Sequence, residues 1–215
     1  MIRILIVGGG FGGVSAYRRL HQLTHRRDDI QITLISRHNF FWFTPMLHEV
    51  ATGGVAREHI VEPLRRILQC CGHRFVEATV SKIDPKHKKV ETNRGVFVYD
   101  YLVVALGTTA NRECVPGAEE YALGFREIND GIRVRNQIVR AFEDATRLTR
   151  VKDMKEHLSF AIVGGGLTGT ELAAQIADWF LDFNEFYPEI PYSAPTITLI
   201  HGGDRLMPQL SKYSS

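Results

Sequence analysis

The sequence predicts an α/β fold in which two domains share one design. Two segments read almost alike, ILIVGGGFGG at residues 4–13 and FAIVGGGLTG at residues 160–169. In each segment an apolar, β-branched run precedes glycines in G-x-G-x-x-G spacing, and a helical pattern follows. A second β-branched strand comes after each helical pattern, as in a βαβ unit. These observations predict two Rossmann-like dinucleotide-binding domains, the first with a small antiparallel insert and the second incomplete.

The composition is that of an ordinary globular protein. The 215 residues are 44% hydrophobic and 23% charged, which is enough to bury a core in one large or two small domains. The net charge of +2 arises from mixed charges, and the basic runs at residues 25–27 and 86–89 are short. Such runs are typical of solvated turns, so no nucleic-acid partner is expected.

Cysteine usage and hydropathy exclude further classes of protein. The three cysteines, Cys70, Cys71 and Cys114, form neither a disulfide framework nor a metal-ligand spacing, so a reducing cytosol and no bound metal are expected. Cys70 and Cys71 follow a helix-like run and are interpreted as buried, small apolar residues. No apolar run approaches the roughly 18 residues of a membrane span, so any membrane contact is expected to be peripheral.

The first glycine turn lies between a predicted strand at residues 2–7 and a helical pattern from Val14 to Leu20. Glycines there would let the backbone approach a pyrophosphate, which the N–H groups and the dipole of the helix N-terminus favour. A turn kept only for its conformation is the alternative. The expected phosphate-binding residues are Gly8, Gly10, Phe11, Gly12 and Gly13.

The next predicted strand, at residues 30–36, ends in Ser36 and Arg37. At this place a βαβ unit that binds a dinucleotide usually has an acid, which holds the ribose hydroxyls. A serine hydroxyl can bond a ribose hydroxyl, and an arginine plane can stack on adenine. The alternative is that both residues form the exposed end of a strand.

An aromatic segment follows, with four aromatic residues at positions 40–43 of the stretch 38–54. The aromatics are too dense for an ordinary surface loop and follow no helical period. They are expected either to fill a domain core or to form the apolar wall around a flat cofactor ring. In the second case Thr44 and the backbone near Pro45 would be the polar edge.

The antiparallel insert and a buried strand complete the first domain, which is expected at residues 1–112. The segment YLVVALGTTA at residues 101–110 predicts the buried strand, and the small Ala105 and Gly107 would let its backbone approach a ligand. The insert is expected from short β-rich runs at residues 75–83, 89–92 and 96–98.

The second domain is expected at residues 113–215. It opens with a predicted helix at residues 130–148, capped by Asn129 or Asp130. Residues 183–195, rich in proline and aromatics, are interpreted as a packed connector.

The second glycine turn repeats the first at an offset of 156 residues. Glu171 is expected in the first turn of the helix that follows. The second strand of this unit ends in His201, again without an acid. The expected pyrophosphate-binding residues are Gly164, Gly166 and Gly169.

Two dinucleotide sites on one chain suit a flavin in the first and a nicotinamide in the second, so that hydride passes between their rings. The chain resembles the type II NADH dehydrogenases, the single-subunit, non-pumping NADH:quinone oxidoreductases of the two-dinucleotide-binding flavoprotein superfamily. The motifs that carry this resemblance cover essentially the whole chain: IVGGGFGG, NFFWFTPMLHEVATG, YDYLVVALGTTAN, IVGGGLTGTELA and ITLIHGGDRLMP.

For the first site, the resemblance implies FAD and assigns residues to each part of it. Gly8, Gly10 and Gly13 would meet the pyrophosphate, and Ser36 and Arg37 would meet the adenosine ribose. Thr44, Pro45 and Gly53 would lie near the isoalloxazine. The backbone of Val80 would lie near the adenine, and Ala105 and Gly107 beside the central portion of the cofactor.

For the second site, the resemblance implies NADH on the glycines of the turn and Glu171 near the nicotinamide as the catalytic residue. Complementarity between the Glu171 carboxylate and the helix dipole is the alternative. Ser36 and His201 depart from the family, which usually has an acid at both places. The choice between NADH and NADPH therefore stays open.

The resemblance also implies quinone as the electron acceptor and a cytoplasmic location, peripheral to the inner face of the plasma membrane. The membrane would be contacted through a segment that lies outside these motifs. The resemblance is also compatible with a homodimer. Disulfide reductases and sulfide:quinone oxidoreductases show a similar pattern but need cysteine pairs near the flavin, and residues 38–54 contain no cysteine.

Two alternatives to a quinone-reducing enzyme remain. One is a dinucleotide-binding fragment without turnover, because members of the family are longer and return from the second domain to complete the first. On that ground the 215-residue chain by itself is expected not to be a competent dehydrogenase. The other is a related flavoprotein, such as a sulfide:quinone or soluble ferredoxin reductase-like enzyme.

Overall fold

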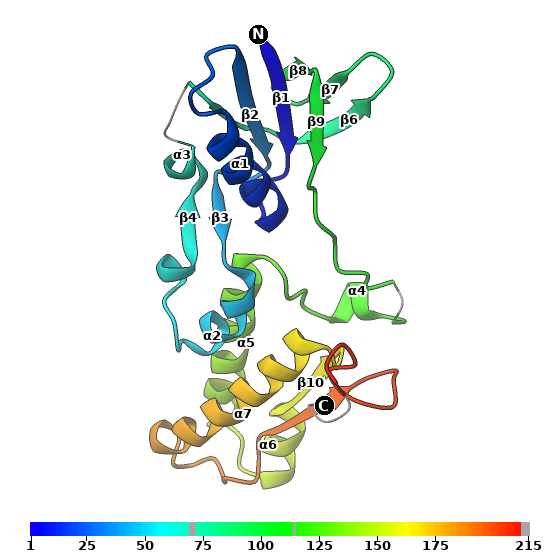
Figure 1. The fold of residues 1–215 in the computed structure, drawn as a ribbon. Coiled ribbons are helices and arrows are strands. Elements are labelled where there is room, and N and C mark those ends of the chain that lie inside the picture. The colour runs from blue at the N-terminus through cyan, green and yellow to red at the C-terminus, as the bar shows by residue number, and fades with distance from the viewer. Residues whose placement is uncertain (69–71, 114, 212–215) are drawn as a thin grey trace. The chain divides into compact units, whose positions relative to one another are not determined.

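A computed structural model describes residues 1–68, 72–113 and 115–211 (Figure 1). The chain divides into two compact units. The first contains Met1–Phe43 and Ile60–Thr109, and the second contains Thr44–His59 and the chain from Ala110 onward. The segment Thr44–His59, which the sequence analysis places inside the first domain, is thus counted with the second unit.

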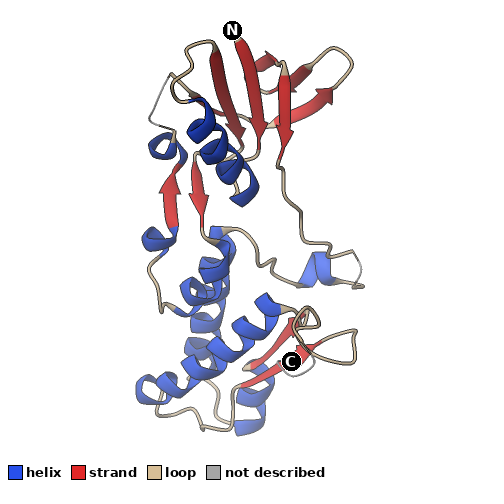
Figure 2. Ribbon diagram, viewed as in Figure 1, coloured by secondary structure: helices blue, strands red, loops and turns tan. Residues whose placement is uncertain are grey.

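The first unit is built on a four-stranded parallel sheet, in which β1 (Ile2–Val7) and β2 (Ile30–Ser36) are the central strands. Helix α1 (Phe11–Thr24) packs on one face of this sheet (Figure 2). There Val14 and Tyr17 are buried against Ile6 and Ile32. The strands, in spatial order, are β5 (Arg74–Glu77), β2 (Ile30–Ser36), β1 (Ile2–Val7) and β9 (Tyr101–Val104).

A three-stranded antiparallel sheet forms the insert and shares a second apolar cluster with the main sheet. In this cluster Val90 of the insert is buried with Leu5, Val7 and Ile35. The insert strands are β6 (Val80–Asp84), β7 (Lys89–Thr92) and β8 (Gly95–Val98). The predicted antiparallel insert is therefore present.

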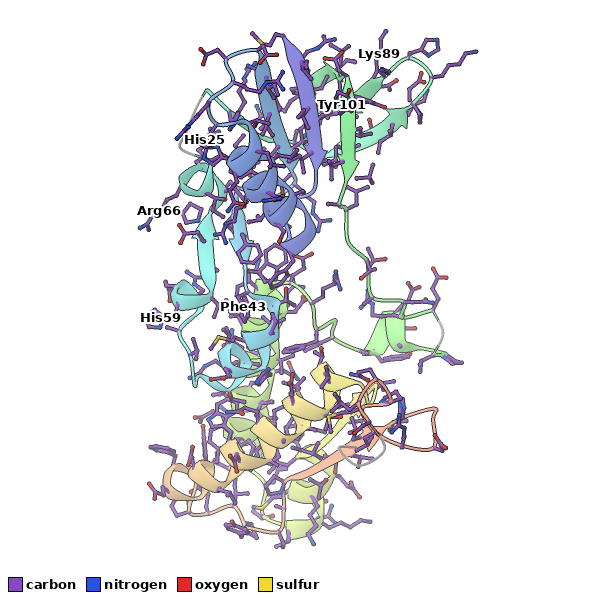
Figure 3. The ribbon with its side chains drawn as sticks, in the orientation of Figure 1. His25, Phe43, His59, Arg66, Lys89 and Tyr101 are labelled. Carbon is purple, nitrogen blue, oxygen red and sulfur yellow. The ribbon has the colours of Figure 1, made fainter. Side chains whose placement is uncertain are left out.

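Two sequence-based expectations for this unit are wrong. The predicted strand at residues 75–83 is two strands: β5 pairs in parallel with β2, and the insert starts only at Val80. The predicted buried strand at residues 101–104 is β9, which lies at the edge of the described sheet and carries Tyr101 (Figure 3). Tyr101 is 65% exposed and Val104 is 57% exposed. Both errors concern pairing partners, which local patterns do not reveal.

The aromatic segment forms a short strand rather than a loop. β3 (Phe40–Trp42) pairs in antiparallel fashion with β4 (Val61–Pro63), and α3 (Leu64–Ile67) follows with Leu64 buried. Between β3 and β4 the chain forms the 3₁₀ helix η1 (Thr44–Met46), helix α2 (Leu47–Thr52) and the 3₁₀ helix η2 (Arg57–Ile60).

The second unit combines a two-stranded parallel sheet with helices. Its main apolar core contains Phe142, Phe180 and Phe183, whose rings contact one another, together with Ala51 of α2. The elements are α4 (Ala118–Tyr121), α5 (Ile128–Ala145), α6 (Val151–His157), β10 (Ser159–Val163), α7 (Leu167–Phe186) and β11 (Thr196–Ile200).

Helix α5 starts earlier than the sequence analysis expects. Its N-cap is Glu127 rather than Asn129 or Asp130, and Asp130 at N3 completes a reciprocal capping box with Glu127. The expected packed connector is confirmed, because Ile190 and Ala194 are both buried in the core of this unit.

Candidate dinucleotide-binding sites

The first glycine turn connects β1 to α1 through backbone that needs glycine. Gly8 has a left-handed φ of +115°, and a Cβ on Gly8 would overlap the carbonyl oxygen of Ala105. A Cβ on Gly13 would overlap the carbonyl oxygen of Gly8. These two glycines let the strand, the turn and the helix pack closely. Gly10 differs from them, because a Cβ there would meet nothing within 4 Å.

The N-terminus of α1 is suited to an anion. Gly10 is the N-cap, no side chain among the described residues caps the helix, and its first turn has no acid. The first N–H groups of a helix have no partner within the helix and lie at the positive end of the dipole. With open space at Gly10, these residues fit a pyrophosphate.

Ser36 and Arg37 lie beside this turn, at the end of β2. A Cβ on Gly9 would come within 2.6 Å of Ser36 Oγ, which accepts a 3.4 Å hydrogen bond from the N–H of His38. The Arg37 side chain is exposed, and its Nε donates to His38 Nε2 at 3.3 Å. The Ser36 hydroxyl thus stands next to the turn, as contact with a ribose would require.

The other residues assigned to the first site have separate places in the structure. Val80 begins β6, and the N–H of Ala105 extends the pairing of β9 by donating to Val7 O at 2.8 Å. Gly107 has a φ of +73°. The ring of Phe11 makes edge contacts with those of Phe41 and Phe43, at centroid distances of 5.0 and 5.5 Å. Part of the aromatic segment therefore packs on the start of α1.

The three remaining flavin residues lie in the second unit. Thr44 and Pro45 belong to η1. Gly53 ends α2 with a φ of +83°, and a Cβ there would overlap the guanidinium of Arg135. That guanidinium also lies over the ring of Trp179, 5.3 Å from its centroid. The left-handed φ of Gly53 favours glycine, and its closeness to the flexible end of Arg135 was missed by sequence reasoning because Arg135 is distant in the chain.

The second glycine turn repeats the geometry of the first. Gly164 has a φ of +117°, Gly166 is the N-cap of α7, and a Cβ on Gly169 would overlap the carbonyl oxygen of Gly164. A Cβ on Gly166 would meet nothing within 4 Å, as at Gly10. Among the described residues, no side chain caps α7 and no acid lies in its first turn. The same anion-binding argument applies here.

His201 occupies the place in the second unit that Ser36 has in the first. It follows Ile200, which pairs with Val163, just as Ser36 follows Ile35, which pairs with Val7. The N–H of Gly165 donates to His201 Nδ1 at 3.2 Å. His201 is therefore held directly against the glycine turn.

Glu171 lies just beyond the first turn of α7, whereas the sequence analysis expects it within that turn. Because α7 begins at Leu167, Glu171 is beyond the first turn, where the helix dipole acts only weakly on a carboxylate. Its Oε2 lies 3.8 Å from Nδ1 of His48 in α2. Sequence reasoning missed His48, because no local pattern indicates that α2 and α7 are neighbours.

Cys70, Cys71 and Cys114, interpreted above from the sequence, lie outside the described residues. Across the part of the chain that the structure describes, no helix has the length and apolar character needed to cross a membrane.

Comparison with known sequences identifies relatives of the whole chain. Residues 2–215 match the pyridine nucleotide-disulphide oxidoreductase family. The chain is 33% identical to the mitochondrial external alternative NAD(P)H-ubiquinone oxidoreductase B4 of Arabidopsis thaliana, over 98% of its own length and 37% of the relative. It is 27% identical to the type II NADH:quinone oxidoreductase of Staphylococcus haemolyticus, over 97% of its own length and 51% of the relative. The chain thus spans about half or less of these proteins.

Solved structures share the fold. NDH2 from Plasmodium falciparum, in complex with NADH, superposes with a TM-score of 0.88 at 26% identity, over 99% of this chain and 44% of that one. The sulfide:quinone oxidoreductase from Aquifex aeolicus has a TM-score of 0.68 at 22% identity, over 94% and 43% of the two chains. The predicted α/β fold of Rossmann-like type is therefore confirmed.

Proposed function

This chain belongs to the pyridine nucleotide-disulphide oxidoreductase family, and from that premise we propose that it carries the two dinucleotide sites of an NAD(P)H:quinone oxidoreductase. The first glycine turn binds FAD and the second binds NADH. Quinone is the final electron acceptor, and the protein works in the cytoplasm, peripheral to the inner face of the plasma membrane. A homodimer is compatible with this proposal.

The observation that carries the proposal is the repeated geometry of the two turns. In each turn the first glycine, Gly8 or Gly164, has a positive φ. A Cβ on the last glycine, Gly13 or Gly169, would overlap the carbonyl oxygen of that first glycine. The N-cap glycine, Gly10 or Gly166, faces open space. Packing alone accounts for the first two positions. It does not account for an open N-cap glycine in front of an uncapped helix, which suits a ligand that approaches the backbone closely.

The identity of the electron acceptor is supported by the names of the relatives. The relatives from Arabidopsis thaliana and Staphylococcus haemolyticus are a ubiquinone and a quinone oxidoreductase. The stretch 38–54 contains no cysteine, so it lacks the dithiol that a disulfide reductase of this family needs beside its flavin.

Within the proposed function, the residues of the chain bind and orient. The N–H groups at the start of α1 and α7 hold the two pyrophosphates, and Ser36 contacts the ribose of the first dinucleotide. Glu171, held by His48, orients the nicotinamide. Bound FAD would supply a relay for two electrons between the reduced nicotinamide and the quinone.

Alanine substitutions at the two open glycines test the proposal. Because a Cβ at Gly10 or Gly166 meets no protein atom within 4 Å, Gly10→Ala and Gly166→Ala should fold normally and obstruct only a bound pyrophosphate. Calorimetric titration should show that Gly10→Ala weakens FAD binding about tenfold and leaves NADH binding intact. Gly166→Ala should do the reverse.

Flavin absorbance then separates binding from turnover. If the chain turns over, adding NADH after it is loaded with FAD bleaches the flavin and adding quinone restores its colour, whereas the fragment without turnover that the sequence analysis expects shows neither change. Binding of both dinucleotides without bleaching would favour the fragment without turnover. If neither substitution changes either affinity, the two turns are not the sites and the proposal is wrong.

A further inference from the structure

The loop that follows β11 folds back on the second glycine turn and fixes the ring of His201. The N–H of Gly165 donates to His201 Nδ1 at 3.2 Å, and the carbonyl of Gly165 accepts from the N–H of Met207 at 2.7 Å. A Cβ on Gly165 would lie 2.8 Å from His201 Cγ, and one on Gly203 would lie 2.9 Å from His201 Nε2. The imidazole is thus enclosed between the turn and the loop.

This contact assigns a protonation state to the ring. To accept from the Gly165 N–H, Nδ1 must carry no proton, so the neutral imidazole has its single proton on Nε2. A second proton on Nδ1 would place two donors face to face. The ring would then release the Gly165 N–H and carry a positive charge beside the turn.

The charged groups around His201 are few. Strand β10 has no charged residue, and the first turn of α7 has no acid. The loop after His201 contributes Asp204 and Arg205, and the guanidinium Nη2 of Arg205 donates to the carbonyls of Pro208 and Leu210 at 2.7 and 3.1 Å. Within the described ranges, no carboxylate forms an ion pair with His201.

The register of β10 and β11 places His201 where a second strand normally presents the acid that binds a ribose 2′-hydroxyl. An acid at this place repels a 2′-phosphate, a neutral imidazole does not, and an imidazolium attracts it. We propose that His201 selects between NADH and NADPH by its charge: the neutral ring accommodates the 2′-hydroxyl, and the protonated ring binds the 2′-phosphate. This inference rests on the proposed function of the second glycine turn.

The test compares the affinities for NADPH and NADH as a function of pH. In the unmodified chain, the ratio of the NADPH to the NADH dissociation constant should fall about tenfold as the pH is lowered and the ring takes up its second proton. In His201→Gln the amide oxygen can still accept from Gly165 but takes up no proton, so this fall should be lost.

Two features of the design isolate the ring. The 2′-phosphate itself gains a proton near about pH 6, but it does so equally with both proteins, so the difference between them reports His201. The matched variant Arg205→Gln removes the other cation of the loop and should keep the pH dependence of the unmodified chain.

Nitrogen-15 NMR of the free chain supplies a readout without any nucleotide. The ring nitrogens of His201 should show the tautomer protonated at Nε2 at high pH, and the Gly165 amide should shift as the ring becomes protonated. A pH-independent affinity ratio with both nucleotides bound would overturn the inference and leave the proposed function intact. Loss of the pH dependence in Arg205→Gln would also overturn it. Failure to bind either nucleotide at any pH would overturn both.

Discussion

At the scale of single residues, the glycines of each turn have different reasons to be glycine. In the second turn, Gly169 lies against the carbonyl oxygen of Gly164, while Gly166 faces open space. A methyl group at Gly169 must therefore displace backbone, whereas one at Gly166 displaces nothing in the protein. The two positions separate a structural requirement from a functional one.

We expect Gly169→Ala to lower the free energy of unfolding by about 1–3 kcal/mol, as overpacking against rigid backbone usually does. Gly166→Ala should cost less than about 1 kcal/mol, the difference between glycine and alanine at an N-cap. Urea unfolding followed by circular dichroism measures both. Equal losses for the two variants would show that the turn has relaxed around Gly169.

His73 makes the first unit sensitive to acid. Its Nδ1 accepts from the N–H of Ile32 at 3.4 Å, and its ring makes edge contacts with Tyr17 and His21. Burial, and secondarily the nearby His21, lowers the pKa of His73 from its ordinary 6.5. Below that pH the unfolded chain takes up a proton that the folded chain resists, so this residue makes stability fall as pH falls.

Replacement of His73 by asparagine tests this linkage, because the amide oxygen of His73→Asn can still accept from Ile32 but cannot be protonated. The stability of the variant should fall less between about pH 7 and about pH 5 than that of the unmodified chain. Urea unfolding at a series of pH values gives the two slopes. Parallel slopes would mean that His73 is protonated alike in the folded and unfolded states.

At the scale of elements, α5 and α7 are joined through aromatic rings. Phe142 of α5 is 2% exposed, and its ring centroid lies 4.3 Å from that of Phe183 and 5.4 Å from that of Phe180. A large buried side chain that touches several others leaves a cavity when it is removed.

Phe142→Ala should therefore lower the free energy of unfolding by about 3–5 kcal/mol. Phe186→Ala is the matched control, because Phe186 is 72% exposed at the end of α7, and it should change stability by less than about 0.5 kcal/mol. Thermal unfolding of both variants measures the difference. A small effect at Phe142 would contradict its place in the core of the second unit.

Elements whose signals are local could be predicted from the sequence. The two repeats of strand, glycine turn and helix were predictable, because the glycine spacing and the apolar periodicity act over a few residues. The division of residues 75–83 into β5 and β6 was not predictable. It depends on the N–H of Ala78 donating to Ser36 O and that of Thr79 donating to Asn93 Oδ1, and these acceptors are remote in sequence.

The candidate site shows the same limit. The glycines, Ser36 and His201 could be identified because each follows directly from a strand end. The neighbours of Glu171 and Gly53 could not, because His48 and Arg135 come close to them only when α2 packs beside α5 and α7. Glu171 lies just outside the first turn rather than inside it because α7 begins at Leu167, and a helix boundary read from a local pattern shifts by one or two residues.

At the scale of the whole molecule, each of the two compact units is made of two separate segments of the chain. Residues 44–59, between two segments of the first unit, belong to the second unit, where Ala51 is fully buried among residues such as Ile138, Leu172 and Ile176. A stretch that the family resemblance assigns to the flavin is thus part of the core that supports the second glycine turn.

This arrangement predicts an effect of residue 51 on the second site. Ala51→Leu should overpack the core and cost about 1–3 kcal/mol, and NADH affinity should fall with stability. Ala56→Leu, at an exposed position of the same segment, should change neither. Stability and NADH titration measured on both variants test the assignment, and an unchanged NADH affinity in a destabilised Ala51→Leu would separate the segment from the second site.

The open edge of β9 has a consequence for handling the protein in solution. Tyr101 and Val104 expose apolar surface on a strand at the edge of the described sheet, and such an edge can pair with the same edge of another molecule. Kosmotropic salts such as sulfate strengthen apolar association. Ammonium sulfate at low concentration should therefore make this chain self-associate reversibly. Val104→Lys should raise the salt concentration at which this association begins.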